Sequence, residues 1–229
     1  MQQRLILVLA ATAIAVVWQL PYGRQLLYPL SLLATFAHEM GHGLTALLMG
    51  ANFDHLQLNP DGSGSAVWRG KPGPLAIAAI AAGGLLGPSI AGVLLLALAR
   101  STQRARGLLA LLAVLLLVCT LLWARNVFGV FFLLSSAAAL VLAARYLSDV
   151  GAALLLHLMA VTLCLSWFTD LDYLFSPEAV VNGARYPSDS AVMAQALWLP
   201  YWFWGGLVAV LSLLVLAVGL VRIGRSTRA

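Results

Sequence analysis

Residues 26–50 read LLYPLSLLATFAHEMGHGLTALLMG, an apolar run that is interrupted at its centre by His38, Glu39 and His42. Residues four apart lie on one face of an α-helix, so both imidazoles can approach the same point. Two histidines at this spacing are a recurrent pair of zinc ligands, and the intervening glutamate is placed to act as a general base beside the metal. The chain holds only four His and two Glu in total, so chance is a poor explanation of the pattern.

The composition is that of a membrane protein. Of the 229 residues 62% are hydrophobic and 9% are charged, with a mean hydropathy of +0.95. Soluble domains carry about 25% charged residues. These values exclude a disordered chain, a disulfide-rich secreted domain and a soluble nucleic-acid binder. The net charge of +5 is typical of a membrane protein whose loops face anionic lipid. Cys119 and Cys164 lie in apolar runs, where we expect them to be small buried residues.

Apolar segments of membrane-spanning length follow one another along the chain. A helical span needs about 20 mostly apolar residues. We expect an all-α polytopic protein with about six to eight transmembrane helices, formed by one integral-membrane domain over residues 1–229. The seven candidate spans are 4–20, 25–49, 74–99, 107–124, 126–145, 149–169 and 198–221.

Two stretches do not resemble membrane spans. Residues 51–73 contain an alternating apolar and polar segment at 53–58, followed by the turn-forming sequence Asn-Pro-Asp-Gly-Ser-Gly at 59–64. This pattern predicts a small β-hairpin directly after the HEMGH helix. Residues 170–197 hold four of the eight acidic residues, and we expect an acidic loop with short helices there.

Two histidines do not complete a catalytic zinc site, which usually has three protein ligands. We favour Asp170 or Asp172 as the third ligand, with Asp170 slightly preferred, because the stretch that holds them directly follows an apolar span and starts at or below the membrane surface. Asp189 opens a helix-like stretch, where an N-cap acid is the commoner role. The remaining candidates, each with a more ordinary structural reading, are Asp149, His157 and His55.

The motifs together resemble the site-2 protease superfamily of intramembrane zinc metallopeptidases. The resemblance rests on HEMGH in a membrane helix and on NPDGSG after it. Weaker similarity to the family is found at Gly83–Pro88, Arg125–Gly129 and Ser188–Ala191. The resemblance is closest to the short peptidase-like branch without a PDZ domain. Typical members have an Asn-x-x-Pro segment and then Leu-Asp-Gly, whose Asp is the third ligand. This chain has Leu171-Asp172-Tyr173, and Asn126 is a distant counterpart of that Asn.

The resemblance implies a zinc metalloendopeptidase that hydrolyses a transmembrane or membrane-proximal peptide, with Glu39 catalytic and Zn²⁺ as cofactor. Asn59 and Asn126 are the candidate substrate-binding residues, and an edge strand at 53–59 or 65–68 could pair with an extended substrate. We expect the bilayer and a transmembrane peptide as partners, no nucleic acid, and a bacterial cell membrane as the location. The alternative is an inactive membrane scaffold that retains the fold; a transporter is disfavoured because no internal repeat is seen.

Overall fold

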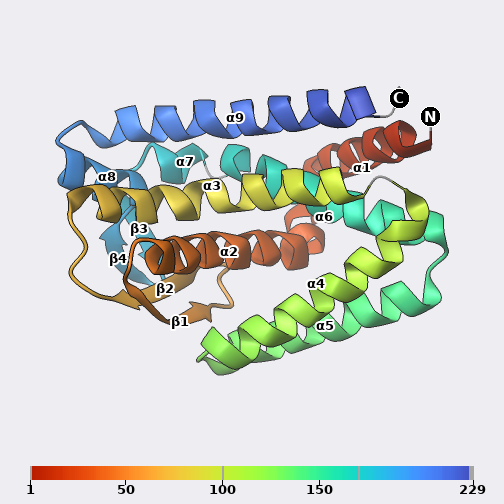
Figure 1. Ribbon diagram of the computed structural model, residues 1–229, viewed down its shortest axis with the longest axis horizontal. Coiled ribbons are helices and arrows are strands. Elements are labelled where there is room, and N and C mark those ends of the chain that lie inside the picture. Colours follow the sequence, from red (N-terminus) through yellow and green to blue (C-terminus); the bar gives the residue numbers. More distant parts are fainter. Residues whose placement is uncertain (1, 100, 170, 227–229) are drawn as a thin grey trace.

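The computed structural model describes residues 2–99, 101–169 and 171–226, and helices dominate this part of the chain (Figure 1). Asp170 lies outside the described residues. The helices are α1 (Gln2–Gln19), α2 (Gly23–Leu48), α3 (Pro74–Leu98), α4 (Thr102–Trp123), α5 (Val127–Tyr146), α6 (Asp149–Thr169), α7 (Leu171–Leu174), α8 (Asp189–Leu197) and α9 (Tyr201–Ser226).

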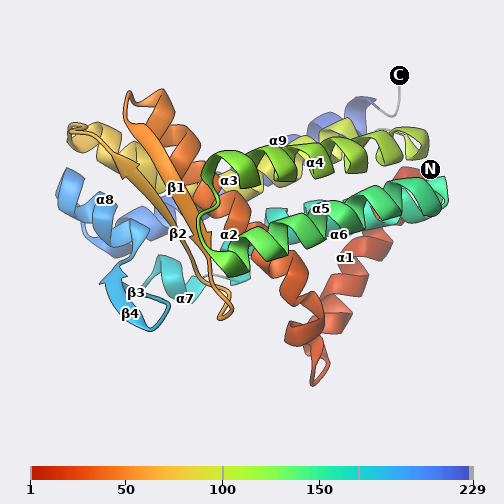
Figure 2. The ribbon, with the colours of Figure 1, turned by 90° about the horizontal axis from the view of Figure 1, so that it is seen from below.

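The predicted polytopic helical architecture is confirmed. Each of the seven candidate spans is covered by one long helix. Among the described residues, five helices are long and apolar enough to cross a membrane: α3, α4, α5, α6 with its continuation to Leu174, and α9. The other two, α1 and α2, meet at a turn and form a V (Figure 2). The chain is an integral, multi-pass membrane protein.

The β-structure gathers at one end of the helical bundle, opposite the end where the first turn of α1 and the last turns of α9 lie (Figure 1). The hairpin predicted after the HEMGH helix is confirmed as β1 (Asn52–Leu58) and β2 (Gly64–Arg69), which pair antiparallel. Phe53, Leu56 and Leu58 point into the apolar core, while Asn59 to Ser63 form the turn. Alternation of apolar and polar residues thus places one hairpin face against the helices.

The second edge of β1 is also occupied, by the short link between α4 and α5. Leu56 forms a parallel bridge with Ala124, and the Arg125 amide donates to the Leu56 carbonyl at 3.2 Å. Asn126 extends this pairing, because its Oδ1 accepts from the Leu58 amide at 3.2 Å and its Nδ2 donates to the Leu58 carbonyl at 2.6 Å. Of the two strands of this hairpin, β2 is therefore the one that keeps a free edge in the described part of the chain.

A second hairpin, which the sequence analysis did not predict, replaces much of the expected acidic loop. It consists of β3 (Glu178–Val181) and β4 (Ala184–Pro187), paired antiparallel. Asn182 and Gly183 form its two-residue turn, both with positive φ, at 48° and 78°. Asn-Gly is the preferred pair for such a turn, so the signal was present but was outweighed by the surrounding polar composition.

Small residues let α2 and α3 approach closely at the level of the HEMGH motif. A Cβ atom on Gly41 would overlap the Gly83 carbonyl, and one on Gly84 would overlap the His42 ring. A Cβ on Gly87 would lie 2.9 Å from the Ala37 carbonyl oxygen. Small residues at helix interfaces permit this backbone contact in membranes. The packing therefore brings α3 directly against the helix that carries the two histidines.

The Asn126 bridge generates a stability prediction. Asn126→Ala removes both hydrogen bonds to Leu58 and leaves the Leu58 polar groups without this partner, so we expect a loss of about 1–3 kcal/mol. The effect is measured as the change in melting temperature when the protein is unfolded by heat in detergent. Asn52→Ala is the matched control, because Asn52 is exposed at the start of β1 and its substitution should change the melting temperature little. Equal melting temperatures for the two variants would refute this role for Asn126.

Candidate metal centre

The HEMGH motif lies within α2 and presents both histidines to the same space, as the spacing predicted. The Nε2 atoms of His38 and His42 are 3.0 Å apart. Glu39 is buried, with 5% of its surface exposed. Three polar side chains are thus concentrated on one buried segment of an apolar bundle.

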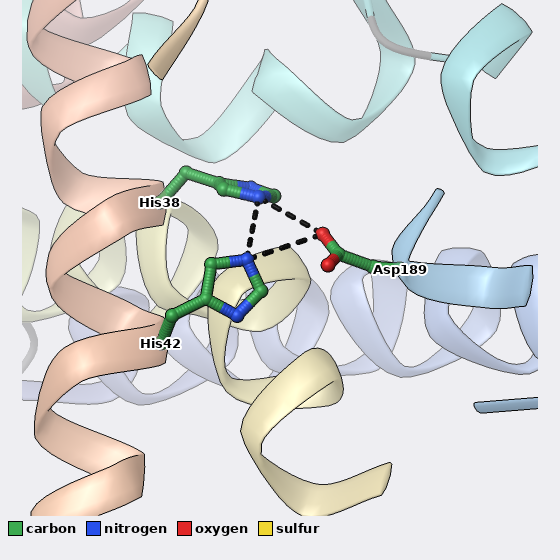
Figure 3. Close-up of side chains that lie close together, drawn as sticks. All are labelled: His38, His42 and Asp189. Carbon is green, nitrogen blue, oxygen red and sulfur yellow. Dashed lines mark hydrogen bonds and ion pairs between the residues drawn. The ribbon is translucent and has the colours of Figure 1, made fainter. Parts of the chain in front are cut away.

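The third member of the cluster is Asp189, at the start of α8. Its Oδ2 lies 3.0 Å from the His38 Nε2 and 3.3 Å from the His42 Nε2 (Figure 3). The N-cap role expected for Asp189 belongs instead to Ser188, whose hydroxyl accepts from the Ala191 amide at 3.2 Å. Because Ser188 caps the helix, the Asp189 carboxylate is free to face the histidines. Among the described residues, these three form the group that could hold a metal ion.

The spacing of the three donor atoms fits a tetrahedral metal. Zinc binds imidazole nitrogen and carboxylate oxygen at about 2.0–2.2 Å, which places neighbouring donors of a tetrahedron about 3.3–3.6 Å apart. The three observed separations, 3.0, 3.0 and 3.3 Å, approach this value. Two nitrogens and one oxygen also suit zinc chemically and leave the fourth position for water or substrate.

The hydrogen bonds around His42 support a cation in the same place. Its Nδ1 lies 2.8 Å from the Ile80 carbonyl oxygen, which can only accept, so Nδ1 carries the proton. In the neutral ring Nε2 is then an acceptor, and it faces the Asp189 Oδ2, which is an acceptor as well. A bound cation satisfies both atoms, as a proton on Nε2 does when no metal is bound. The contact with Ile80 is also the usual second partner of a metal-binding histidine.

Electrostatics keeps the Asp189 carboxylate ionised in this position. Burial alone would raise its pKa by penalising the charged form, but in the absence of a metal the neighbouring His42 and His38, when protonated, outweigh burial through their charge and hydrogen bonds and hold the pKa of Asp189 well below its ordinary value. The carboxylate is therefore present as an anion, the form in which it can bind a metal.

Glu39 is held between the histidines and the β1–β2 hairpin. The Glu39 carboxylate lies close to the Ala66 backbone amide of β2. Gly64 makes room for it, because a Cβ at position 64 would lie 2.7 Å from the Glu39 Oε1. The free edge of β2 thus faces the candidate metal centre at Ala66.

A cavity of about 510 Å³ opens beside these residues, between β2 and the β3–β4 hairpin. Apart from Glu39 and the three candidate ligands, its lining is uncharged and mainly of small or aliphatic residues. The two hairpins touch across it, because the Asn182 amide donates to the Ser63 hydroxyl at 3.2 Å. The volume and the mainly uncharged lining of the cavity suit a short uncharged stretch of peptide beside the candidate metal centre.

The structure places the other predicted site residues differently. Asp172 is exposed on α7 and is not part of the group of donor atoms, so Asp189 takes the place expected for it. Asn59 lines the cavity and is buried, with its Nδ2 donating to the Ser63 hydroxyl at 3.1 Å. Asn126 lies outside the cavity lining, because both ends of its amide are engaged by Leu58. Asn126 thus has a structural role, and its predicted contact with substrate stays a prediction.

The other three residues considered as metal ligands, His157, His55 and Asp149, make structural contacts away from the candidate metal centre. His157 is buried, with Nδ1 2.7 Å from the Ala153 carbonyl oxygen. His55 contacts Asp54 on the hairpin at 3.2 Å, and Asp149 pairs with Arg106 at 2.9 Å. Each interaction satisfies a polar group away from the cluster of His38, His42 and Asp189.

The geometry defines a helical membrane protein with a His-Glu-x-x-His motif whose two histidines, together with an aspartate, could hold a metal ion. A comparison with protein families agrees, since the model of the Peptidase M50B-like family matches residues 7–219. The chain belongs to this family, which is part of the site-2 protease group of intramembrane metallopeptidases. Neither the curated proteins nor the solved structures contain a match to it.

The close contact between Gly84 and His42 generates a prediction on metal binding. Gly84→Ala adds a methyl group that overlaps the His42 ring, so the ring must move and we expect zinc affinity to fall at least about ten-fold. Zinc per chain after dialysis against a weak chelator measures the effect. Gly107→Ala is the matched control, because a Cβ there meets nothing within 4 Å. Full zinc retention by Gly84→Ala would show that α3 does not constrain His42.

Proposed function

We propose that this protein is an active zinc metalloendopeptidase that hydrolyses a peptide bond of a transmembrane or membrane-proximal substrate. The observation that carries the proposal is the convergence of His38, His42 and Asp189 within 3.3 Å of one another, with Glu39 buried beside them. Membership of a metallopeptidase family supports the same reaction class. His38, His42 and Asp189 would hold the zinc.

Zinc, when bound in such a site, supplies a Lewis acid and makes a water acidic enough to ionise near neutral pH. Glu39 is the general base, because its carboxylate is next to the two histidines and packs against Gly64 of β2. After the water has attacked the scissile carbonyl, Glu39 donates the proton that it took from this water to the leaving amine. Its low exposure protects the proton transfer from bulk water.

The substrate is bound as an extended strand along the free edge of β2. A helix hides its carbonyl groups in its own hydrogen bonds, so a transmembrane segment must unwind before it can be cleaved. Strand addition supplies backbone hydrogen bonds to the unwound segment. The cavity lies on this edge, next to Glu39, and its uncharged lining suits a segment that comes from the bilayer. Asn59 contributes a polar group at the end of the cavity.

An inactive membrane scaffold with the same fold remains the second candidate, because a retained metal site does not require turnover. The two readings differ in one measurable product. Hydrolysis in H₂¹⁸O adds one ¹⁸O atom to each newly formed carboxylate, whereas a scaffold forms no new carboxylate. Wild-type protein that binds zinc but cleaves none of a panel of single-span model peptides would favour the scaffold.

The central prediction concerns Glu39. Glu39→Gln removes the base and keeps the shape of the side chain, so we expect about one zinc per chain and a loss of turnover of about 10²–10⁴-fold. The assay uses detergent-purified protein, model transmembrane peptides and mass spectrometry of the products in H₂¹⁸O. Cleavage by Glu39→Gln at the wild-type rate would overturn the mechanism.

The identity of the third ligand is tested separately by zinc content. We expect Asp189→Asn and His38→Ala to lose zinc, and Asp172→Asn to retain it, since Asp172 is exposed and outside the cluster. The pair Asp189→Asn and Asp172→Asn removes the same charge from two positions near each other in the chain. Zinc loss in Asp172→Asn alone would reverse the assignment.

Gly64 allows metal binding and catalysis to be separated. Gly64→Ala would place a Cβ 2.7 Å from the Glu39 Oε1 and 2.8 Å from the Thr35 Cγ2, so the Glu39 carboxylate must move while the histidines stay. We expect normal zinc content with turnover lowered about 100-fold, as for a base displaced by about 1 Å. Gly73→Ala, which meets nothing within 4 Å, serves as control. Unchanged turnover in Gly64→Ala would contradict the placement of Glu39.

A further inference from the structure

Tyr173 on α7 makes two hydrogen bonds to one residue, the candidate ligand Asp189. Its hydroxyl donates to the Asp189 Oδ2 at 2.9 Å and accepts from the Asp189 backbone amide at 3.3 Å. The Oδ2 atom is the same one that faces both histidines. The Tyr173 ring also packs edge-on against the His38 ring, with 6.1 Å between centroids. One side chain thus contacts two of the three candidate ligands.

We propose that Tyr173 is a positioning residue which holds the Asp189 carboxylate in the orientation that binds zinc. The inference rests on the zinc site of the proposed function and adds a residue that the HEMGH motif does not contain. It concerns metal affinity, which is measured without any substrate. Tyr173 therefore acts through Asp189 and not on the peptide.

The backbone near Asp189 is fixed by other contacts, so the carboxylate orientation is the freedom that Tyr173 removes. The Ser190 hydroxyl donates to the Leu174 carbonyl at 2.8 Å, and the Ser188 hydroxyl donates to the Ser176 carbonyl. The Ser188 amide also donates to the Pro177 carbonyl at 3.2 Å. These bonds tie the first turn of α8 to α7 and the segment after it.

A carboxylate on such a fixed backbone can still rotate about its side-chain torsions. The Tyr173 hydroxyl selects one rotamer, because it bonds the backbone amide and the carboxylate of the same residue. Partners of this kind orient metal ligands, and their loss costs about 10–100-fold in metal affinity. His42 has its own partner in Ile80, so the site contains an orienting contact for two of its ligands.

The test is the Zn²⁺ affinity of Tyr173→Phe, measured by competition with a chromogenic chelator in detergent. This change removes one oxygen atom and keeps the ring beside His38. We expect about 10–100-fold weaker binding than in the wild type. We also expect an altered visible absorption spectrum of the Co²⁺-loaded protein, because this spectrum reports the geometry of the bound ion.

Tyr28→Phe is the matched control. The Tyr28 hydroxyl also makes one long-range hydrogen bond, to the Pro60 carbonyl at 2.8 Å, but it contacts no candidate ligand. Size-exclusion chromatography and thermal melting in the presence of a chelator compare the folding of the two metal-free variants. Tyr173→Leu, which lacks both hydroxyl and ring, should lose at least as much affinity as Tyr173→Phe.

Two results would overturn the inference. One is a Tyr173→Phe protein with wild-type Zn²⁺ affinity and a wild-type Co²⁺ spectrum. The other is an equal loss of affinity in Tyr28→Phe, which would assign the effect to general destabilisation. In both cases the wild type still binds zinc and the proposed peptidase stands. A wild-type protein that binds no zinc removes the proposed function and this inference together.

Discussion

A buried carboxylate facing two imidazoles is the constraint around which the described parts of this molecule are arranged. An unpaired charge costs several kcal/mol to bury, so Asp189 requires compensation from its neighbours. His38 and His42 provide it from α2, and Tyr173 adds a donor from α7. These elements are distant in the sequence, and the packing of α2, α3, α7 and α8 is what brings their polar groups to one point.

α2 and α3 approach each other closely because glycines lie on both helices where they meet. Gly41, Gly83 and Gly84 remove the side chains that would separate α2 from α3. The same contact lets the Ile80 carbonyl reach the His42 ring. Gly64 plays the corresponding part on the hairpin, where it admits Glu39. Gly84 faces His42 and Gly64 faces Glu39, so these two glycines serve the site as well as the fold.

The sequence predicted what depends on local spacing. HEMGH presents His38 and His42 on one helix face, and the turn residues after Asn59 form the expected hairpin. The third donor depends on tertiary packing, and Asp170 or Asp172 was favoured over Asp189 because both directly follow a span. The order Ser188-Asp189 carried a usable signal, since the serine caps α8 and releases the aspartate. Asn182-Gly183 likewise indicated β3–β4, although no local pattern could place this hairpin over the cavity.

The two hairpins are joined across the cavity by the hydrogen bond between Asn182 and Ser63. A single bond of this kind contributes about 1 kcal/mol, which is less than twice the thermal energy per mole. A closed and an open arrangement of the hairpins would then be populated within about an order of magnitude of each other if this bond alone separated them. This hydrogen bond by itself would therefore add little to the free energy needed to widen the entry to the cavity.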